Sequence, residues 1–204
     1  YTAVGGQALS YSTNGNLVAM PGAAFSYDAQ NRVVSASNGT NTVAFSYDAQ
    51  NRLVSAANGS NTVTFTYDGR NRCVARTVNG ATIWMIWDDW SLIEERDGTG
   101  AVQAAYIHGA RVDEVLARLS GETALIYHED ALGSVIALTD IAGNVVEQYR
   151  YDVYGQPSLF DATGQPLSTS AVGNRFMFTG REWLPELGLY DYRNRVYSAA
   201  LGRF

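Results

Sequence analysis

The side chains that could bind a metal are few. His108 and His128 are the only histidines in the chain, and they lie 20 residues apart. A structure that repeats every 20 residues would place them on one face. A metal site needs three or four ligands, and Glu129 or Asp130 alone adds too little to the histidines. The sequence therefore predicts no metal site, and we interpret both histidines as ordinary polar positions.

Nucleophilic and acid–base chemistry have equally little support. Asp88 and Asp89 are adjacent, so in a strand their side chains would point to opposite faces and could not share a proton-transfer step. Cys73 is the only cysteine and lies beside Val74 in an apolar run, which favours a buried, unreactive thiol. The sequence has no G-x-S-x-G nucleophile elbow and no glycine-rich phosphate loop. We therefore expect no cofactor and no enzyme activity.

The charge pattern excludes several classes of partner. The net charge is −6, all 14 basic residues are arginine, and no basic run exists, so we expect no nucleic-acid binding. No apolar run reaches the roughly 18 residues that a membrane span requires. Lysine side chains on edge strands commonly prevent edge-to-edge pairing, and this chain has no lysine. Self-association through sheet edges therefore remains an alternative.

A 20-residue repeat is the strongest pattern in the chain. The phrase FSYDAQNR at residues 25–32 recurs unchanged at 45–52, and it recurs as FTYDGRNR at 65–72. A weaker echo at residues 84–90 puts Trp87-Asp88 in the Tyr-Asp place. The repeat positions that we expect to be structural are Tyr27, Asp28, Arg32, Tyr47, Asp48, Arg52, Tyr67, Asp68 and Arg72.

Each repeat predicts two strands and two turns. Apolar residues alternate with small ones from Val43 to Tyr47, which is typical of a strand. A tight loop follows, in which Asp48 can accept backbone N–H bonds and Asn51 tolerates the left-handed conformation. Strong hairpin signals stand at Asn38-Gly39, Asn58-Gly59 and Asn79-Gly80. The sequence therefore predicts an antiparallel meander.

The aromatic residues of the repeats should share one face of this meander. We expect Tyr27, Tyr47 and Tyr67 to align across every second strand, with a phenylalanine two residues before each. Buried rings in such rows would form an inward ladder that holds successive hairpins together. The alternative is an exposed row of rings that stacks on sugars.

The second half keeps strand character without the strict repeat. Residues 112–119 fit either a short helix or an irregular strand, and residues 158–173 predict a loop or an insertion. Its distinctive phrases are YHEDALGSV at 127–135, TD at 139–140, GN at 143–144, YRYDVYG at 149–155, NRFMFTGRE at 174–182, GLY at 188–190, YRNR at 192–195 and LGRF at 201–204.

These phrases resemble a known family. The Tyr-Asp repeats resemble the RHS/YD repeats, and the stretch from Tyr127 to Phe204 resembles the RHS repeat-associated core domain. The resemblance implies a large hollow β-shell that encloses a C-terminal toxic domain in bacterial toxins, whereas related repeats of animal teneurins serve adhesion. It also implies the partners, which would be the rest of the parent shell and its enclosed toxin or effector domain. The expected location is the bacterial cell surface or the exterior.

The resemblance further implies an aspartyl-type self-cleavage that uses one arginine and two aspartates. Arg195, seven residues before Gly202, matches the family's arginine. The first family aspartate would fall a few residues past Phe204, so we expect this chain to be inactive as a protease. Ser198-Ala199 stands where many members carry Asp-Pro. Apart from this family role, Arg195 could equally bond to strand-end carbonyls or to Asp191.

Taken together, the sequence predicts an all-β fold, an antiparallel β-hairpin meander that curls as part of a spiral shell. We divide it into YD/RHS β-hairpin repeats at residues 1–126 and a truncated RHS core domain at residues 127–204. The expected function is a structural segment of an encapsulating shell. The alternatives are a glycan-binding or adhesion module of a cell-surface protein and a remnant of the self-cleaving core domain.

Overall fold

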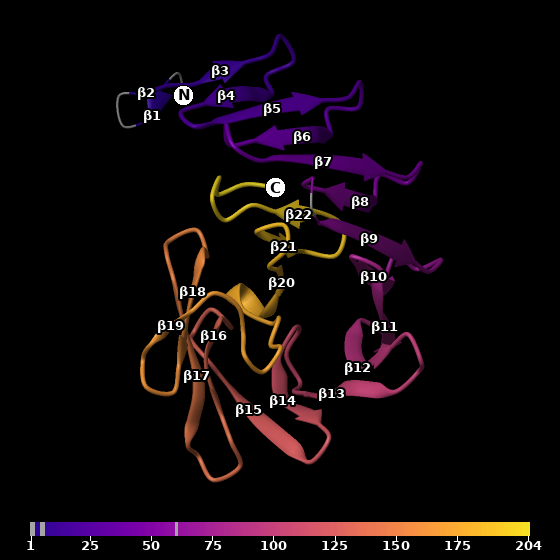
Figure 1. Cartoon of the computed structure of the whole chain (residues 1–204), viewed down its shortest axis with the longest axis vertical. Helices are drawn as coiled ribbons and strands as arrows, with labels where there is room; N and C mark the ends of the chain where they lie inside the picture. The colour runs from indigo at the N-terminus through magenta and orange to yellow at the C-terminus, as the bar shows by residue number, and fades with distance from the viewer. Residues whose placement is uncertain (1–2, 5–6, 60) are drawn as a thin grey trace. The chain divides into compact units, whose positions relative to one another are not determined.

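The computed structural model of the chain describes residues 3–4, 7–59 and 61–204. These residues form short strands joined by tight turns, with one three-residue 3-10 helix (Figure 1). Consecutive strands pair antiparallel, so the prediction of an all-β antiparallel meander is confirmed. Within the described ranges, no helix has the length and apolar character needed to pass through a bilayer.

The elements follow one another in chain order (Figure 1). The first ten strands are β1 (Ala3–Val4), β2 (Gln7–Ala8), β3 (Ser10–Tyr11), β4 (Leu17–Met20), β5 (Ala23–Tyr27), β6 (Val33–Ser37), β7 (Thr42–Tyr47), β8 (Leu53–Ala57), β9 (Thr62–Tyr67) and β10 (Cys73–Val78). The next nine are β11 (Ala81–Asp88), β12 (Ser91–Asp97), β13 (Val102–His108), β14 (Val115–Ser120), β15 (Thr123–Glu129), β16 (Val135–Thr139), β17 (Val145–Tyr151), β18 (Pro157–Asp161) and β19 (Pro166–Leu167). The last elements are the 3-10 helix η1 (Phe178–Gly180), β20 (Glu182–Leu184), β21 (Leu189–Asp191) and β22 (Val196–Tyr197).

The chain divides into two compact units. The first unit contains Tyr1–Phe65 and Thr77–Gly80, and the second contains Thr66–Arg76 and Ala81–Phe204. The expected boundary between repeats and core domain, after residue 126, falls inside β15. That division into family domains stays a prediction.

The first unit is a regular ladder in which each strand from β3 to β9 pairs with the next. Phe25 lies opposite Ala36, and Phe45 lies opposite Ala56. The phenylalanine rings of successive repeats are therefore separated by a strand that carries alanine at the paired position. In both repeats the register shifts just before the tyrosine, between Ser26 and Tyr27 and again between residues 46 and 47. Such a bulge re-aims the side chain that follows it.

The second unit has a sheet of consecutive pairs from β11 to β19 and a three-stranded sheet, β20-β21-β22. The segment from Ser170 to Phe204, which we call the C-terminal segment, packs on the larger sheet, where Phe176 lies 5.1 Å from Tyr106, ring centre to ring centre. Buried side chains of this unit include Leu92, Tyr106, Leu125, Tyr127, Tyr149, Phe176, Met177 and Tyr190. The fully buried Tyr190 lies 4.7 Å from Trp183, ring centre to ring centre.

Two local expectations are decided by the second unit. Residues 112–119, which fit either a helix or a strand, form β14 from Val115 onward. Residues 158–173, expected to be a loop or an insertion, are not all loop, because β19 and most of β18 lie in this range. Leu159 pairs across the sheet with Tyr149 and is buried, so tertiary packing extends the meander despite the Ser/Thr/Gly-rich sequence.

Candidate functional site

Each repeat of the first unit carries the same set of side-chain contacts. Tyr27 donates its hydroxyl to the Leu17 carbonyl at 2.8 Å, and Tyr47 donates to the carbonyl of Val33 at 2.9 Å. The aspartate after each tyrosine accepts backbone N–H bonds from the second and fourth residues beyond it, at 2.9 and 3.0 Å in both repeats. The tyrosine thus reaches back to the preceding hairpin, while the aspartate fixes the loop that follows.

The arginine that closes each loop completes the set. Arg32 Nε lies 2.6 Å from Asp28, and the matching pair of Arg52 and Asp48 is 2.7 Å apart. The Arg32 guanidinium also reaches forward, donating to the Asp48 carbonyl at 3.2 Å and lying 4.8 Å from the Tyr47 ring centre. Each Tyr-Asp-Arg set therefore links one hairpin to the next.

The same bonds lower the pKa values of the loop aspartates. The backbone N–H of Arg32 is the main group that holds the pKa of Asp28 below its ordinary value, with the Arg32 side chain and the N–H of Gln30 acting in the same direction. Asp48 has its pKa lowered in the same way by Arg52. The loops therefore favour ionised aspartates.

The third set, Tyr67, Asp68 and Arg72, lies at the start of the second unit. Arg72 pairs with Asp68 at 2.7 Å and donates to the Asp89 carbonyl at 2.7 Å. The pKa of Asp68 is also lowered, because hydrogen bonds and the charge of Arg72 outweigh the effect of burial. Tyr67 ends β9 and is half-buried.

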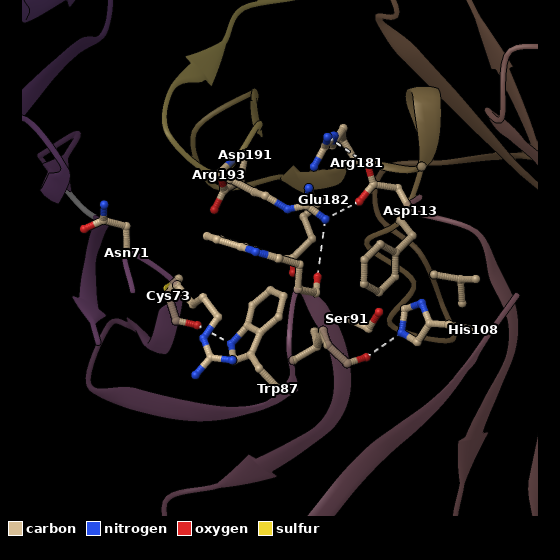
Figure 2. A pocket seen from close by; sticks show the side chains of 16 residues that line it. Asn71, Cys73, Trp87, Ser91, His108, Asp113, Arg181, Glu182, Asp191 and Arg193 are labelled. Carbon is tan, nitrogen blue, oxygen red and sulfur yellow. Dashed lines mark hydrogen bonds and ion pairs between the residues drawn. The ribbon is translucent and has the colours of Figure 1, made fainter. Parts of the chain in front are cut away.

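Other residue types take the tyrosine place along the second unit. Trp87 donates Nε1 to the carbonyl of Cys73 at 2.8 Å, and Nε2 of His108 lies 2.7 Å from the Leu92 carbonyl (Figure 2). In both strands a register shift directly precedes this residue, as it does before Tyr27 and Tyr47. The sequence analysis missed this role of His108, although its 21-residue distance from Trp87 was a usable signal.

The C-terminal segment is held on the sheet of the second unit by buried polar groups. Glu147, only 1 % exposed, accepts the N–H of Ala171 at 2.5 Å and the hydroxyl of Ser170 at 2.8 Å. Tyr127 donates to the side chain of Asn174 at 2.8 Å. A single apolar substitution at these sites would leave a buried polar group without a partner.

A buried arginine lies at the centre of this contact. Arg175 is 7 % exposed and forms ion pairs with Glu95 of β12 and, at 3.4 Å, with Glu182 of β20. The guanidinium thus joins the larger sheet to the three-stranded sheet of the C-terminal segment.

A second ionic contact joins the β13–β14 loop to the C-terminal segment. Asp113 pairs with Arg181 at 2.7 Å and with Arg193 at 2.5 Å (Figure 2). Asp113 and Arg193 both have positive φ, 62° and 66°, a region that is uncommon for non-glycine residues, although aspartate enters it more often than arginine. Gly180 lies against this loop, because a Cβ there would come within 2.6 Å of the Asp113 carbonyl.

Arg195, the residue matched to the family's self-cleavage arginine, is exposed. Its guanidinium lies 4.0 Å from the ring centre of Phe204, an arrangement that favours a cation–π contact. Asp191, its suggested partner, instead accepts the backbone N–H of Arg193 at 2.6 Å. The family role of Arg195 stays a prediction.

The remaining candidates are placed apart. His128 contacts the Thr139 hydroxyl at 3.0 Å, while His108 lines a cavity of about 50 Å³ together with Cys73. Burial raises the pKa of the Cys73 thiol to about 12, so the thiolate is disfavoured. Across the part of the chain that the structure covers, no three His, Cys, Asp or Glu residues are grouped to hold a metal ion.

The fold and these contacts define an all-β hairpin-repeat protein. Residues 27–62 and 47–82 each match the profile of the RHS Repeat family, which supports RHS repeats in this part of the chain.

Relatives and solved structures add two findings. The chain is 29 % identical over 117 residues to a tRNA3(Ser)-specific nuclease WapA of Bacillus spizizenii and 28 % identical over 117 residues to the tRNA nuclease WapA of Bacillus subtilis strain 168. Each match covers 57 % of this chain, and the chain spans about 5 % of the length of each relative. Among solved structures, that of TcdB2-TccC3 is similar to this chain at 14 % sequence identity and a TM-score of 0.43. The alignment covers 98 % of this chain and 9 % of the TcdB2-TccC3 chain. At these values the structural similarity supports no conclusion about function.

Proposed function

We propose that this chain is a structural segment of an RHS-repeat shell that encloses a C-terminal toxin or effector domain. The observation that carries the proposal is the repeated Tyr-Asp-Arg set in the part of the chain that matches RHS Repeat. The contacts described for these sets join neighbouring hairpins, so an array of this kind can be extended into a long wall by adding repeats. The fixed twist of a sheet would curl such a wall.

In this proposal the chain has a structural role and no enzymatic one. Its partners are the rest of the parent shell and the enclosed domain, and its location is the cell surface or exterior of a bacterium. The relatives are named as tRNA nucleases, but the shared part is about 5 % of their length. We therefore assign the shared part to the scaffold and leave the nuclease activity to other parts of those proteins.

The tyrosine contacts favour this role over a sugar-stacking platform. The hydroxyl of Tyr47 is already bonded to a backbone carbonyl, and the Arg32 guanidinium lies over its ring. A sugar would have to displace the arginine from the ring, and the arginine would lose its contacts with the next loop.

Protease protection tests the proposal in the longer protein that would contain this segment. We expect the domain after the RHS region to resist protease in the parent protein and to be digested when expressed alone. Tyr47→Ala combined with Arg52→Ala should expose it by loosening the wall, whereas the exposed Arg70→Ala should not. Digestion of the downstream domain at the same rate in the parent protein and in isolation would contradict enclosure.

A further inference from the structure

Two carboxylates face each other where the C-terminal segment lies on the larger sheet of the second unit. Glu182 of β20 and Asp191 of β21 are direct partners in the antiparallel register, so their side chains leave the same face about 5 Å apart. Both line the cavity of about 50 Å³ (Figure 2). Glu182 is only 9 % exposed and Asp191 is partly buried, so water screens this pair less than it would screen a surface pair.

The arginines near this pair form their ion pairs with carboxylates other than Asp191. Glu182 shares Arg175 with Glu95, and Arg181 and Arg193 both pair with Asp113. Asp191 accepts the backbone N–H of Arg193, and within the described residues it forms no ion pair with an arginine. An ionised Asp191 would therefore add a negative charge that no arginine pairs with directly.

Several elements contribute groups that act on Asp191. Burial raises its pKa to about 7, the charge of Glu182 acts in the same direction, and the N–H of Arg193 and the charges of Arg181 and Arg175 oppose it. From β10, the thiol of Cys73 shares the cavity, and the negative charge of Asp191 contributes to its raised pKa. The other polar or charged lining groups are Asn71, Arg72, Ser91, His108 and Asp113.

We propose that Asp191 is a proton-linked latch, which seats β20 and β21 on the larger sheet while its carboxyl is protonated and loosens them when it ionises. A loosened hairpin exposes Asp191 to water, where its pKa returns toward the ordinary 3.8. Between pH 3.8 and about 7, opening therefore releases a proton and is favoured by rising pH. The seated state is strongest below this window and weakest above it.

Cys73 provides a built-in reporter of this opening. It is the only cysteine in the chain, it is 8 % exposed, and it lines the cavity beside Asp191. We would label it with a small thiol reagent in the complete 204-residue chain at a series of pH values. The thiol is labelled in the loosened state, where it and residue 191 both lie in water. Its ionisation there is common to both chains, so it cancels when the rate is divided by that of Asp191→Asn at the same pH. Asparagine keeps the acceptor for the Arg193 N–H.

The proposal predicts that this ratio rises roughly tenfold or more between pH 5 and pH 8, because one proton is released on opening. The matched control is Asp161→Asn, in an exposed turn whose carboxylate accepts backbone N–H bonds that asparagine also accepts. Its labelling should follow the parent chain at every pH. A ratio for Asp191→Asn that stays constant with pH would overturn the latch.

A second variant keeps the test decisive if Asp191→Asn fails to fold, which circular dichroism would reveal. Glu182→Gln removes the like charge opposite Asp191, so the pKa of Asp191 in the seated state should fall. The midpoint of the pH-dependent rise in the labelling rate should then move to lower pH. An unchanged midpoint in a folded Glu182→Gln chain would equally overturn the proposal. Neither outcome depends on whether the parent protein encloses a toxin, because both are measured on this chain alone.

Discussion

The two compact units use the same hairpin but bury it differently. In the first unit Phe25, Tyr27, Phe45 and Tyr47 are half-buried, and Phe65 at its end is buried. The hydroxyls of Tyr27 and Tyr47 bond to hairpins that are neighbours in the chain. In the second unit Tyr106, Tyr127 and Tyr149 are buried under the C-terminal segment. Local contacts therefore account for the ladder, whereas the depth of burial depends on what covers its face.

Their charges differ in the same way. The Asp28–Arg32 pair of the first unit keeps about a fifth of each side chain exposed, 22 % and 23 %. The Arg175–Glu95 pair of the second unit keeps 9 % of each. Removing one partner of a buried pair leaves a charge without water or counter-ion, so the second unit should respond far more strongly to such changes.

The largest expected effect is on the aromatic core of the second unit. Tyr190→Ala should cost about 3–5 kcal/mol of the free energy of unfolding, because it empties a fully buried site and removes the bond to the Gly155 carbonyl. Tyr47→Ala in the first unit should cost markedly less, because its ring is only half-buried. Urea unfolding followed by circular dichroism measures both, and equal costs would show that the two rings are equally important for stability despite their different burial.

The buried ion pair comes next. Arg175→Met should destabilise the chain by about 3 kcal/mol, because Glu95 and Glu182 would stay buried without their counter-ion. The matched change is Arg70→Met, which removes the partner of Asp89 from a pair that is more than half exposed. That variant should lie within about 1 kcal/mol of the parent in the same unfolding experiment. A similar loss in both variants would show that burial does not set the difference.

A smaller effect is expected at the loop asparagines of the repeats. Asn51 has φ of 64°, so Asn51→Ala should cost about 1 kcal/mol, because alanine is strained in the left-handed region. Asn51→Gly should be nearly neutral, because glycine adopts this conformation freely. Thermal unfolding of the two variants gives the comparison, and an alanine variant as stable as the glycine variant would show that the turn does not depend on φ.

The smallest effect concerns acid stability of the ladder. The Arg52 N–H lowers the pKa of Asp48, so its contribution to stability is present above the ordinary value of 3.8 and is lost as pH falls through the lowered pKa. Asp48→Asn should therefore flatten the loss of stability below about pH 4, while leaving the slope near neutral pH unchanged. Urea midpoints at several pH values test this, and a parallel pH profile would argue against it.

Much of the first unit could be predicted from the repeated phrase. The alternation around Phe45, the loop at Asp48 and the positive φ of Asn51 all follow from neighbours within one hairpin. The second unit was harder, because its strands lack the strict repeat. His108 bonds to the Leu92 carbonyl although its residue type breaks the Tyr-Asp pattern, and β18 forms in a segment whose composition predicts a loop.

By itself the sequence determined the class of fold, the hairpin spacing and the turns, because these depend on side-chain periodicity and on backbone preferences that act over a few residues. Only the tertiary structure decided which charges meet. Glu95, Arg175, Glu182 and Asp191 are far apart in the chain, except where a hairpin pairs two of them. Their pairing and their burial arise when the C-terminal segment packs on the sheet, and no local pattern encodes the energy of a charge removed from water.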